Sequence, residues 1–209
     1  MNITAYQVLE TIKTAEGNEV SLRGLSSAEG QTLVIGVFHG DEPQGEQIIN
    51  RYMEESKNSN ILFIPCLNPD GKLKNQRVNS NGVDLNRNFP TKNWEWTEQG
   101  SYYGGTAPAS EVETGFIVDV LEKYKPSAII TLHTPYKIVN YDGPAQGLAE
   151  FISGIMDYPV EPNIGYPTPG SFGTYAGIER NIPTITLEMD EYAPIEKLYG
   201  LLKQIFDEL

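Results

Sequence analysis

The 209-residue sequence contains one cysteine, two histidines and few basic residues. The single Cys66 excludes an intramolecular disulfide and any cysteine-based zinc cluster. Lys and Arg number 15 against 28 Asp and Glu, and the resulting formal net charge of −13 argues against a nucleic-acid or anionic-membrane partner. The longest apolar runs, residues 33–38 and 128–132, are far shorter than the ~20 residues of a membrane span.

The composition that remains is that of a globular protein. Hydrophobic residues make up 39% of the chain and charged residues 21%, which lies within the globular range. No repeat and no change of composition marks a boundary, so residues 1–209 are predicted to form a single domain. Residues 1–6 lack the basic and apolar regions of a signal peptide, which favours a cytoplasmic location.

The hydrophobic pattern predicts strands that alternate with helices. An N-terminal edge hairpin is expected at about 6–25 around a Gly/Asn turn. Continuous apolar runs, typical of strands covered on both faces, predict strands at 33–38, 61–67 and 128–132, and a further strand is predicted at 184–187. Helices are expected after Pro43, around 148–156 and at 195–209. This order predicts an α/β domain of three layers.

Capping and turn signals add detail to this prediction. Ser110 and Glu113 form an S-x-x-E capping box, which predicts a helix from Ser110 to just before Pro126. Residues 68–71 are expected to form a turn, and residues 72–103 and 158–173 are expected to be long loops.

Both histidines and one glutamate follow predicted buried strands. His39, His133 and Glu188 each come directly after the last residue of such a strand. Ligands of open α/β sheets bind in the crevice beyond the carboxyl ends of the strands. We therefore expect these three side chains to point into one site.

Glu42 completes a set of metal-binding side chains. It stands three residues after His39, and His133 adds a second imidazole. Two imidazoles and a carboxylate are a common ligand set of hydrolytic zinc, which leaves one position for water, and Glu188 would take a proton from that water. An isolated H-x-x-E or a lone histidine more often has a structural role, so the prediction depends on the combination.

Two loop arginines, Arg77 and Arg87, stand out against the acidic background. A guanidinium can bind a carboxylate through two parallel hydrogen bonds, or it can stabilise a developing oxyanion. The alternative is that both are ordinary solvated side chains.

These motifs together resemble the zinc carboxypeptidase family. The matching segments occur in order across most of the chain, at 39–42, 68–71, 84–89, 110–113, 133 and 186–189. The resemblance implies a central mixed, mostly parallel β-sheet flanked by helices. It also implies one zinc ion per chain, bound by His39, Glu42 and His133.

The resemblance further implies roles for residues around the metal. Glu188 would be the general base and proton shuttle, and Arg77 would polarise the scissile carbonyl. Four more residues would bind substrate, the first two of them through its free carboxylate: Asn86, Arg87, Tyr136 and Phe172. The substrate-capping tyrosine of the family matches Tyr166 only if a shift of one residue is allowed.

Within the family, the compact size and segments 81–90 and 168–173 are most similar to murein tripeptide amidases. The expected partner is therefore a small peptide, cleaved between γ-D-glutamate and meso-diaminopimelate during peptidoglycan recycling. Three alternatives remain open: a carboxypeptidase for other C-terminal peptides, a deacylase of the aspartoacylase and succinylglutamate desuccinylase type, and a non-catalytic peptide-binding module that retains zinc. The sequence also leaves open whether the chain forms a homodimer.

Overall fold

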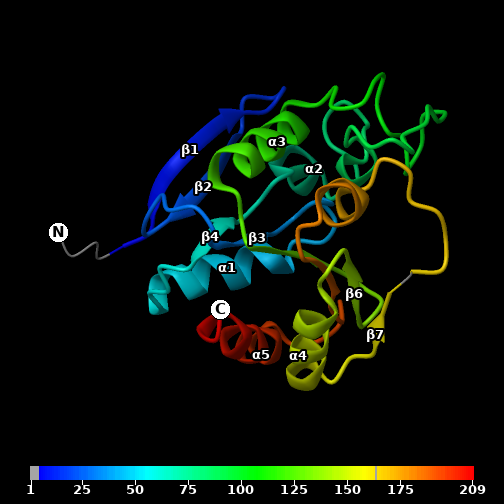
Figure 1. Ribbon diagram of the computed structural model, residues 1–209. Helices are drawn as coiled ribbons and strands as arrows, with labels where there is room; N and C mark the ends of the chain where they lie inside the picture. Colours follow the sequence, from blue (N-terminus) through cyan, green and yellow to red (C-terminus); the bar gives the residue numbers. More distant parts are fainter. Residues whose placement is uncertain (1–4, 163) are drawn as a thin grey trace.

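A computed structural model of the protein describes residues 5–162 and 164–209 (Figure 1). Within these residues, eight strands form one sheet in the order β1-β2-β4-β3-β5-β8-β6-β7. The strands are β1 (Gln7–Lys13), β2 (Glu19–Gly24), β3 (Thr32–Ile35), β4 (Ile61–Ile64), β5 (Ala128–His133), β6 (Ile138–Asp142), β7 (Val160–Glu161) and β8 (Thr184–Glu188). The central strands β4, β3, β5 and β8 are parallel, as are β6 and β7, whereas β1, β2 and β6 each join a neighbour antiparallel.

Helices cover both faces of this sheet. They are α1 (Gln44–Glu55), α2 (Pro69–Lys74), α3 (Val112–Tyr124), α4 (Gln146–Met156) and α5 (Ile195–Asp207), with a 3₁₀ turn η1 (Leu85–Arg87) and a π-helical turn η2 (Gly173–Ile178). Helices α1, α4 and α5 pack on one face, and α3 lies on the other (Figure 1). None of the helices in the described ranges combines the length and the apolarity that crossing a membrane requires.

Successive residues of strands β3 and β4 belong to different cores. Leu33 and Ile35 pack with α3, whereas Val34 between them packs with α1, α4 and α5. A strand buried on both faces needs apolar residues at every position, which explains the continuous apolar runs. The predicted three-layer α/β architecture with a mixed, mostly parallel sheet is confirmed.

The strand ends differ from the prediction. Strand β3 ends at Ile35 rather than at residue 38. A Cβ at Gly36 would lie 2.4 Å from the carbonyl oxygen of Pro65, and Val37 has a left-handed φ of 51°, so the chain leaves the sheet here. His39 consequently lies in the loop before α1, whereas His133 and Glu188 are the last residues of β5 and β8.

Two sequence signals have a different structural meaning from the one predicted. Residues 68–71 begin helix α2 rather than form a simple turn, because the Asn68 side chain accepts a hydrogen bond from the Gly71 N–H (2.9 Å). The capping box is absent, since α3 begins at Val112 without a side-chain cap. The Ser110 hydroxyl instead donates to Glu111 (2.7 Å), and Glu113 is buried.

The N-terminal hairpin is confirmed and is anchored to α2. Strands β1 and β2 pair antiparallel. In α2 the fully buried Asp70 accepts hydrogen bonds from Thr14 (2.7 Å) and Asn18 (2.8 Å) near the hairpin turn, and from Ser80 (2.8 Å). This carboxylate therefore fixes the edge of the sheet to the loop that carries Arg77.

Candidate metal centre and active site

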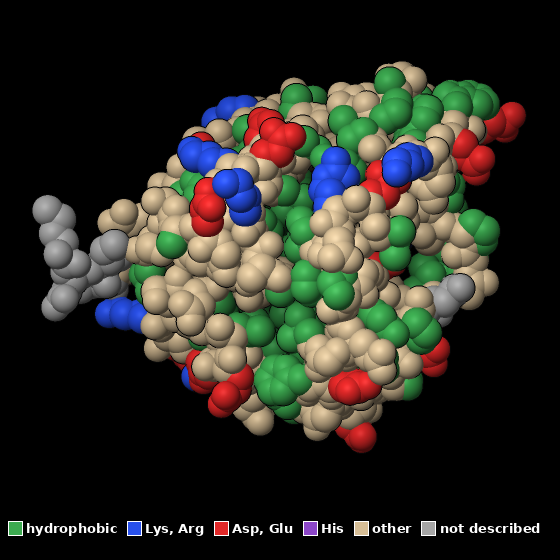
Figure 2. All heavy atoms as spheres, in the orientation of Figure 1, with side chains coloured by type: hydrophobic (Ala, Val, Ile, Leu, Met, Phe, Trp, Pro, Cys, Tyr) green, Lys and Arg blue, Asp and Glu red, His purple; other side chains and the backbone are tan. Residues whose placement is uncertain are grey.

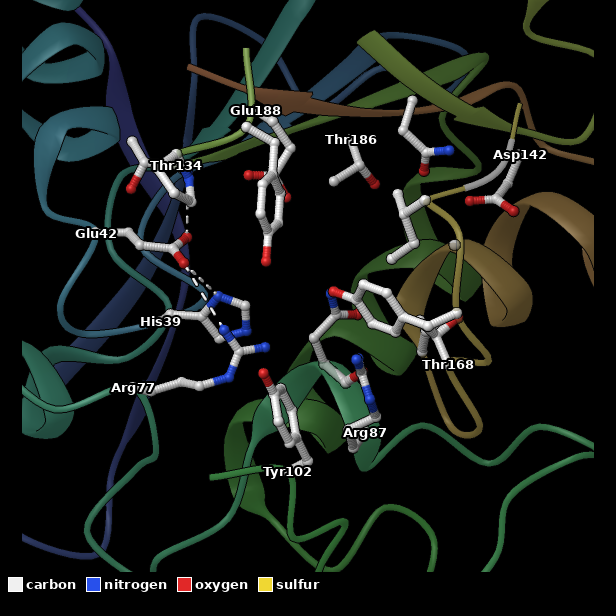
Figure 3. Close-up of a pocket in the computed structure, with 18 of the residues that line it drawn as sticks. His39, Glu42, Arg77, Arg87, Tyr102, Thr134, Asp142, Thr168, Thr186 and Glu188 are labelled. Atoms are coloured by element: carbon white, nitrogen blue, oxygen red, sulfur yellow. Dashed lines mark hydrogen bonds and ion pairs between the residues drawn. The ribbon is translucent and has the colours of Figure 1, made fainter. Parts of the chain in front are cut away.

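A pocket of about 490 Å³ opens beyond the carboxyl ends of β5 and β8. Its walls come from the loop before α1, from η1, from strands β6 and β8, and from the segment before η2. The side chains of His39, Glu42 and Arg77 lie close together on one side of it (Figure 3). On the face of the molecule drawn in Figure 2, Lys and Arg side chains are interspersed with Asp and Glu side chains rather than gathered in one patch.

His39, Glu42 and His133 converge at one end of the pocket. The two oxygens of Glu42 lie 2.9 Å from His39 Nδ1 and 2.9 Å from His133 Nδ1, and the two Nδ1 atoms are 3.3 Å apart. All three side chains are buried. The sequence prediction that they lie together is thus met, with a carboxylate between two imidazoles.

This arrangement fits a metal ion. Glu42 Oε1 lies 2.9 Å from His39 Nδ1 and Asp84 Oδ1 lies 3.2 Å from its Nε2, so each nitrogen of this ring faces a carboxylate oxygen, which only accepts. A metal ion at Nδ1 would leave the proton of the ring on Nε2, where Asp84 accepts it. Carboxylate oxygens and imidazole nitrogens that face one another in a buried place need a cation between them, either a proton or a metal ion. The spacing agrees as well, since neighbouring ligands of a tetrahedral zinc ion with bonds of about 2.0–2.1 Å lie roughly 3.3 Å apart.

The electrostatics of the three residues point the same way. Burial opposes a charge on His39, but the carboxylates of Glu42 and Asp84 outweigh it and raise the pKa of His39 to about 9. The pKa of Glu42 lies well below its usual range in spite of burial, because both histidines favour its ionised form. The site therefore stabilises positive charge at this point, whether a proton or a metal ion carries it.

Glu188 is a buried carboxylate in the same pocket. Its Oε2 atom is fully enclosed and has no hydrogen-bond partner among the described residues. Burial, together with the negative charge of Glu42, raises the pKa of Glu188 to about 8. The Tyr136 backbone N–H forms a hydrogen bond with this carboxyl group, and Oε2 stays free. A carboxyl group with one free oxygen and a pKa near neutrality is suited to accept and return a proton.

Asp84 joins the metal site to Arg77. The Nε and Nη2 atoms of Arg77 each donate to Asp84 Oδ2 at 3.0 Å, and Nη1 lies 3.8 Å from Glu42 Oε1. Asp84 is completely buried and also accepts a hydrogen bond from the Asn86 N–H (2.9 Å). One carboxylate thus contacts both His39, a candidate metal ligand, and the guanidinium of Arg77.

Comparison with known proteins decides the family. The sequence profile described as zinc carboxypeptidase matches residues 6–150. The chain belongs to the zinc carboxypeptidase family. Members of this family are hydrolytic metalloenzymes, and the resemblance stated from the motifs is confirmed.

Sequence relatives and solved structures similar to this zinc carboxypeptidase agree with the family assignment. Murein peptide amidase A of Escherichia coli K12 is 30% identical over 189 residues, covering 83% of this chain and 76% of that protein. Murein peptide amidase A of Vibrio campbellii is 35% identical over 176 residues, covering 75% and 68%. The murein-tripeptide amidase structure from Escherichia coli O157 has a TM-score of 0.82 at 23% identity and covers 98% of this chain and 91% of that one. Carboxypeptidase A from Helicoverpa armigera has a TM-score of 0.77 at 15% identity, with 98% and 67% covered, so both structures share the fold.

The predicted substrate-binding residues of this zinc carboxypeptidase lie in two places. Asn86, Arg87 and Tyr136 line the pocket together with Tyr166. Phe172 does not line it, because its ring is buried among Phe38 and Phe89, with ring centroids 5.5 Å and 4.9 Å away. The predicted direct contact of the Phe172 side chain with substrate is therefore corrected. The Phe172 N–H instead donates to Asn86 Oδ1 (2.8 Å) and so orients that amide.

Sequence reasoning missed several residues of the pocket. Asp84 stands inside the matched segment 84–89, but its contact with His39 spans 45 positions and no local pattern reveals it. Tyr102, in the predicted long loop, places its ring 5.0 Å from the Arg77 guanidinium carbon and 5.6 Å from that of Arg87. Asp142 was missed because strand β6 was not predicted.

Proposed function

We propose that this zinc carboxypeptidase acts on a small murein peptide, hydrolysing the amide bond between γ-D-glutamate and meso-diaminopimelate in cytoplasmic peptidoglycan recycling. Two relatives of this name, at 30% and 35% identity over most of the chain, support that substrate class. The observation that carries the hydrolytic part is the buried Glu188, whose Oε2 atom has no hydrogen-bond partner among the described residues, in one pocket with the His39, Glu42 and His133 cluster.

The metal ion and Glu188 have different roles in the proposed hydrolysis. Zinc held by His39, Glu42 and His133 would act as a Lewis acid on the scissile carbonyl and lower the pKa of a water molecule. The ionised form of Glu188 takes a proton from the attacking water, and the carboxyl group then donates it to the nitrogen of the leaving amine. Its raised pKa suits both halves of this transfer.

Arg77 stabilises the charge that develops on the carbonyl oxygen. Its guanidinium is held by Asp84 through two hydrogen bonds of 3.0 Å, so it is oriented before substrate binds. The Nη1 group, which lies nearest to Glu42, is directed toward the metal ligands. A fixed donor in a buried site stabilises a developing oxyanion without first having to reorient.

Arg87 and Asn86 bind the free α-carboxylate of the residue that is released. Arg87 is buried, and its Nη1 donates to the Asn86 carbonyl (2.6 Å), which fixes the guanidinium at the pocket wall. Tyr136 is about half exposed at the mouth of the pocket and contacts the substrate there. Phe172 acts indirectly through its hydrogen bond to Asn86.

The single hydrogen-bonded sheet that holds this pocket supports one domain over 1–209.

Mass spectrometry of L-Ala-γ-D-Glu-meso-diaminopimelate incubated with zinc-loaded protein tests this function. We expect free diaminopimelate from the parent protein, a loss of about 100-fold or more in Glu188→Gln, and parental activity in Glu191→Gln, an exposed acid of the same pocket. The zinc content of all three proteins should be equal. Parental activity in Glu188→Gln would overturn the assignment of the base.

Two further results would redirect the proposal. Cleavage of ordinary C-terminal peptides instead of the tripeptide would identify a general carboxypeptidase. Cleavage of neither would require tests on N-acyl amino acids, because a deacylase would hydrolyse those and a binding module would not.

A further inference from the structure

Tyr102 stands between the two arginines of the pocket. Its ring centre lies 5.0 Å from the guanidinium carbon of Arg77 and 5.6 Å from that of Arg87. Tyr102 lines the pocket and is 56% exposed, so its ring faces the cavity rather than a hydrophobic core. In the close-up, its side chain lies between these two arginines and its hydroxyl points into the pocket (Figure 3).

The loop backbone next to Tyr102 is fixed to the segment that carries the site. The Tyr103 carbonyl accepts a hydrogen bond from the Asp84 N–H (2.8 Å), and the Tyr103 N–H donates to the Gly100 carbonyl (3.1 Å). The Tyr103 side chain is buried. Because Asp84 also holds the guanidinium of Arg77, the ring of Tyr102 and this guanidinium are positioned together before substrate binds.

The Tyr102 hydroxyl has a proton to donate and no acceptor beside it. Among the described residues Tyr102 takes part in one hydrogen bond, which its backbone carbonyl accepts from the Thr97 hydroxyl (3.4 Å). A guanidinium only donates, so neither neighbouring arginine can accept the proton of the phenol. The hydroxyl is therefore available to donate to an acceptor on a ligand.

The surroundings of this hydroxyl favour a negatively charged acceptor. Arg77 and Arg87 place two positive charges beside the ring. Asp84 (3.0 Å) and Glu42 (3.8 Å) offset the charge of Arg77. No acidic side chain in the described ranges pairs with Arg87, whose Nη1 donates to the Asn86 carbonyl (2.6 Å). A carboxylate suits this position best, because a hydrogen bond to an ionised acceptor is about twice as strong as one to a neutral acceptor.

The acyl part of the substrate passes Tyr102 as it leaves the pocket. In the proposed function the scissile carbonyl lies at Arg77, and the α-carboxylate of the released residue lies at Arg87. A second cavity of about 530 Å³ shares Arg77 with the pocket and is also lined by Gln99 and Ser101, which precede Tyr102 in the chain. Because the released residue occupies the Arg87 side, the acyl part extends past Arg77 along this loop.

On this basis we infer that the Tyr102 hydroxyl binds a free carboxylate on the acyl residue of the substrate and so determines specificity on that side of the scissile bond. The inference rests on the proposed function and narrows it to peptides whose acyl residue is acidic. In a γ-glutamyl amide the α-carboxylate is free, and two methylene groups and the α-carbon separate it from the scissile carbonyl. An acyl residue without a second carboxylate offers the phenol no charged acceptor.

Two peptides that differ only in this carboxylate test the inference: L-Ala-γ-D-Glu-meso-diaminopimelate and its analogue with γ-aminobutyrate in place of D-glutamate. The zinc-loaded parent should cleave the first with a kcat/KM about tenfold or more above that of the second, which lacks the acceptor of a charge-assisted hydrogen bond. Tyr102→Phe removes the hydroxyl and keeps the ring beside both guanidiniums. It should lose the preference, chiefly through a higher KM for the glutamyl peptide, and cleave the aminobutyryl peptide as the parent does.

Tyr192→Phe is the matched control. Tyr192 is 87% exposed and lines neither cavity, so this variant should keep the parental preference. An equal loss on both peptides in Tyr102→Phe would refute the inference, because it would show that the hydroxyl acts through the arginines or the fold. An unchanged preference in Tyr102→Phe, or a parent that cleaves both peptides equally well, would refute it too.

Binding measurements separate this inference from failure of the proposed function. If the parent cleaves neither peptide, the proposed function fails, and calorimetry with the acyl fragments L-Ala-D-Glu and L-Ala-γ-aminobutyrate decides the role of Tyr102. Tighter binding of L-Ala-D-Glu by the parent, lost in Tyr102→Phe, supports the inference. Equal binding of the two fragments by the parent, or a selectivity that the variant keeps, refutes it.

Discussion

Replacing Asp84 with asparagine should weaken zinc binding while the protein stays folded. Asp84 is fully buried and accepts hydrogen bonds from His39 Nε2 (3.2 Å), from two nitrogens of Arg77 (3.0 Å each) and from the Asn86 N–H (2.9 Å). Asparagine has nearly the same size, but it is uncharged and has one acceptor oxygen instead of two. His39 then loses the negative charge that makes its Nδ1 a stronger ligand.

The size of the effect follows from this position. A carboxylate that orients a metal-bound histidine changes metal affinity by about 10–100-fold, which corresponds to about 1.4–2.7 kcal/mol. We expect the dissociation constant for zinc to rise within that range. Catalysis at saturating zinc should fall as well, because Arg77 loses the carboxylate that holds its guanidinium.

Competition between metal-free protein and a chelator of known zinc affinity measures the change. Asp70→Asn is the matched control, because Asp70 is equally buried and accepts hydrogen bonds from Thr14, Asn18 and Ser80, yet contacts no metal ligand. It should lower the free energy of unfolding and leave zinc affinity unchanged. Parental affinity in Asp84→Asn, or an equal loss in both variants, would refute the reasoning.

Two further predictions concern substrate binding and stability. Arg87→Ala should raise KM for the tripeptide about tenfold or more with a smaller effect on kcat, and an unchanged KM in steady-state kinetics would contradict the carboxylate clamp. Burial raises the pKa of Glu113 to about 7, so the folded protein keeps a proton that the unfolded chain releases above its ordinary pKa of 4.5. The free energy of unfolding should therefore fall as the pH rises from about 4.5 to about 7. In urea unfolding, Glu113→Gln should have a free energy of unfolding about 3 kcal/mol above that of the parent at about pH 8 and nearly the same as the parent at about pH 4. The same pH dependence in parent and variant would exclude this role for Glu113.

The parts of the fold that the sequence predicts are those with a strong local signal. Strands β3, β4 and β5 are buried on both faces, and their apolar runs are a clear signal. Strand β8 instead alternates Ile185 and Leu187, which lie in one core, with polar residues. Strand β6 was missed because it is short and carries Asn140 and Asp142, which face the pocket rather than a core. Where β3 ends could not be predicted either, because the close approach of Gly36 to Pro65 is a tertiary contact.

The site residues also differ in how strong their signal in the sequence is. His39, Glu42 and His133 are found from the sequence because few residue types bind zinc and the chain has only two histidines. Asp84 and Asp142 are two among 28 acidic residues, and only the folded chain shows which acid meets His39 and which is left unpaired in the pocket. Phe172 was predicted to bind substrate, but its aromatic ring packs in the hydrophobic core instead of lining the pocket.

A zinc titration of metal-free protein that follows bound metal and release of diaminopimelate together tests the central claim most directly. The account predicts that both rise in parallel and reach a plateau at one zinc ion per chain, and that His133→Ala shows neither. Release of diaminopimelate by protein kept free of metal, or activity that does not follow the bound zinc, would contradict it.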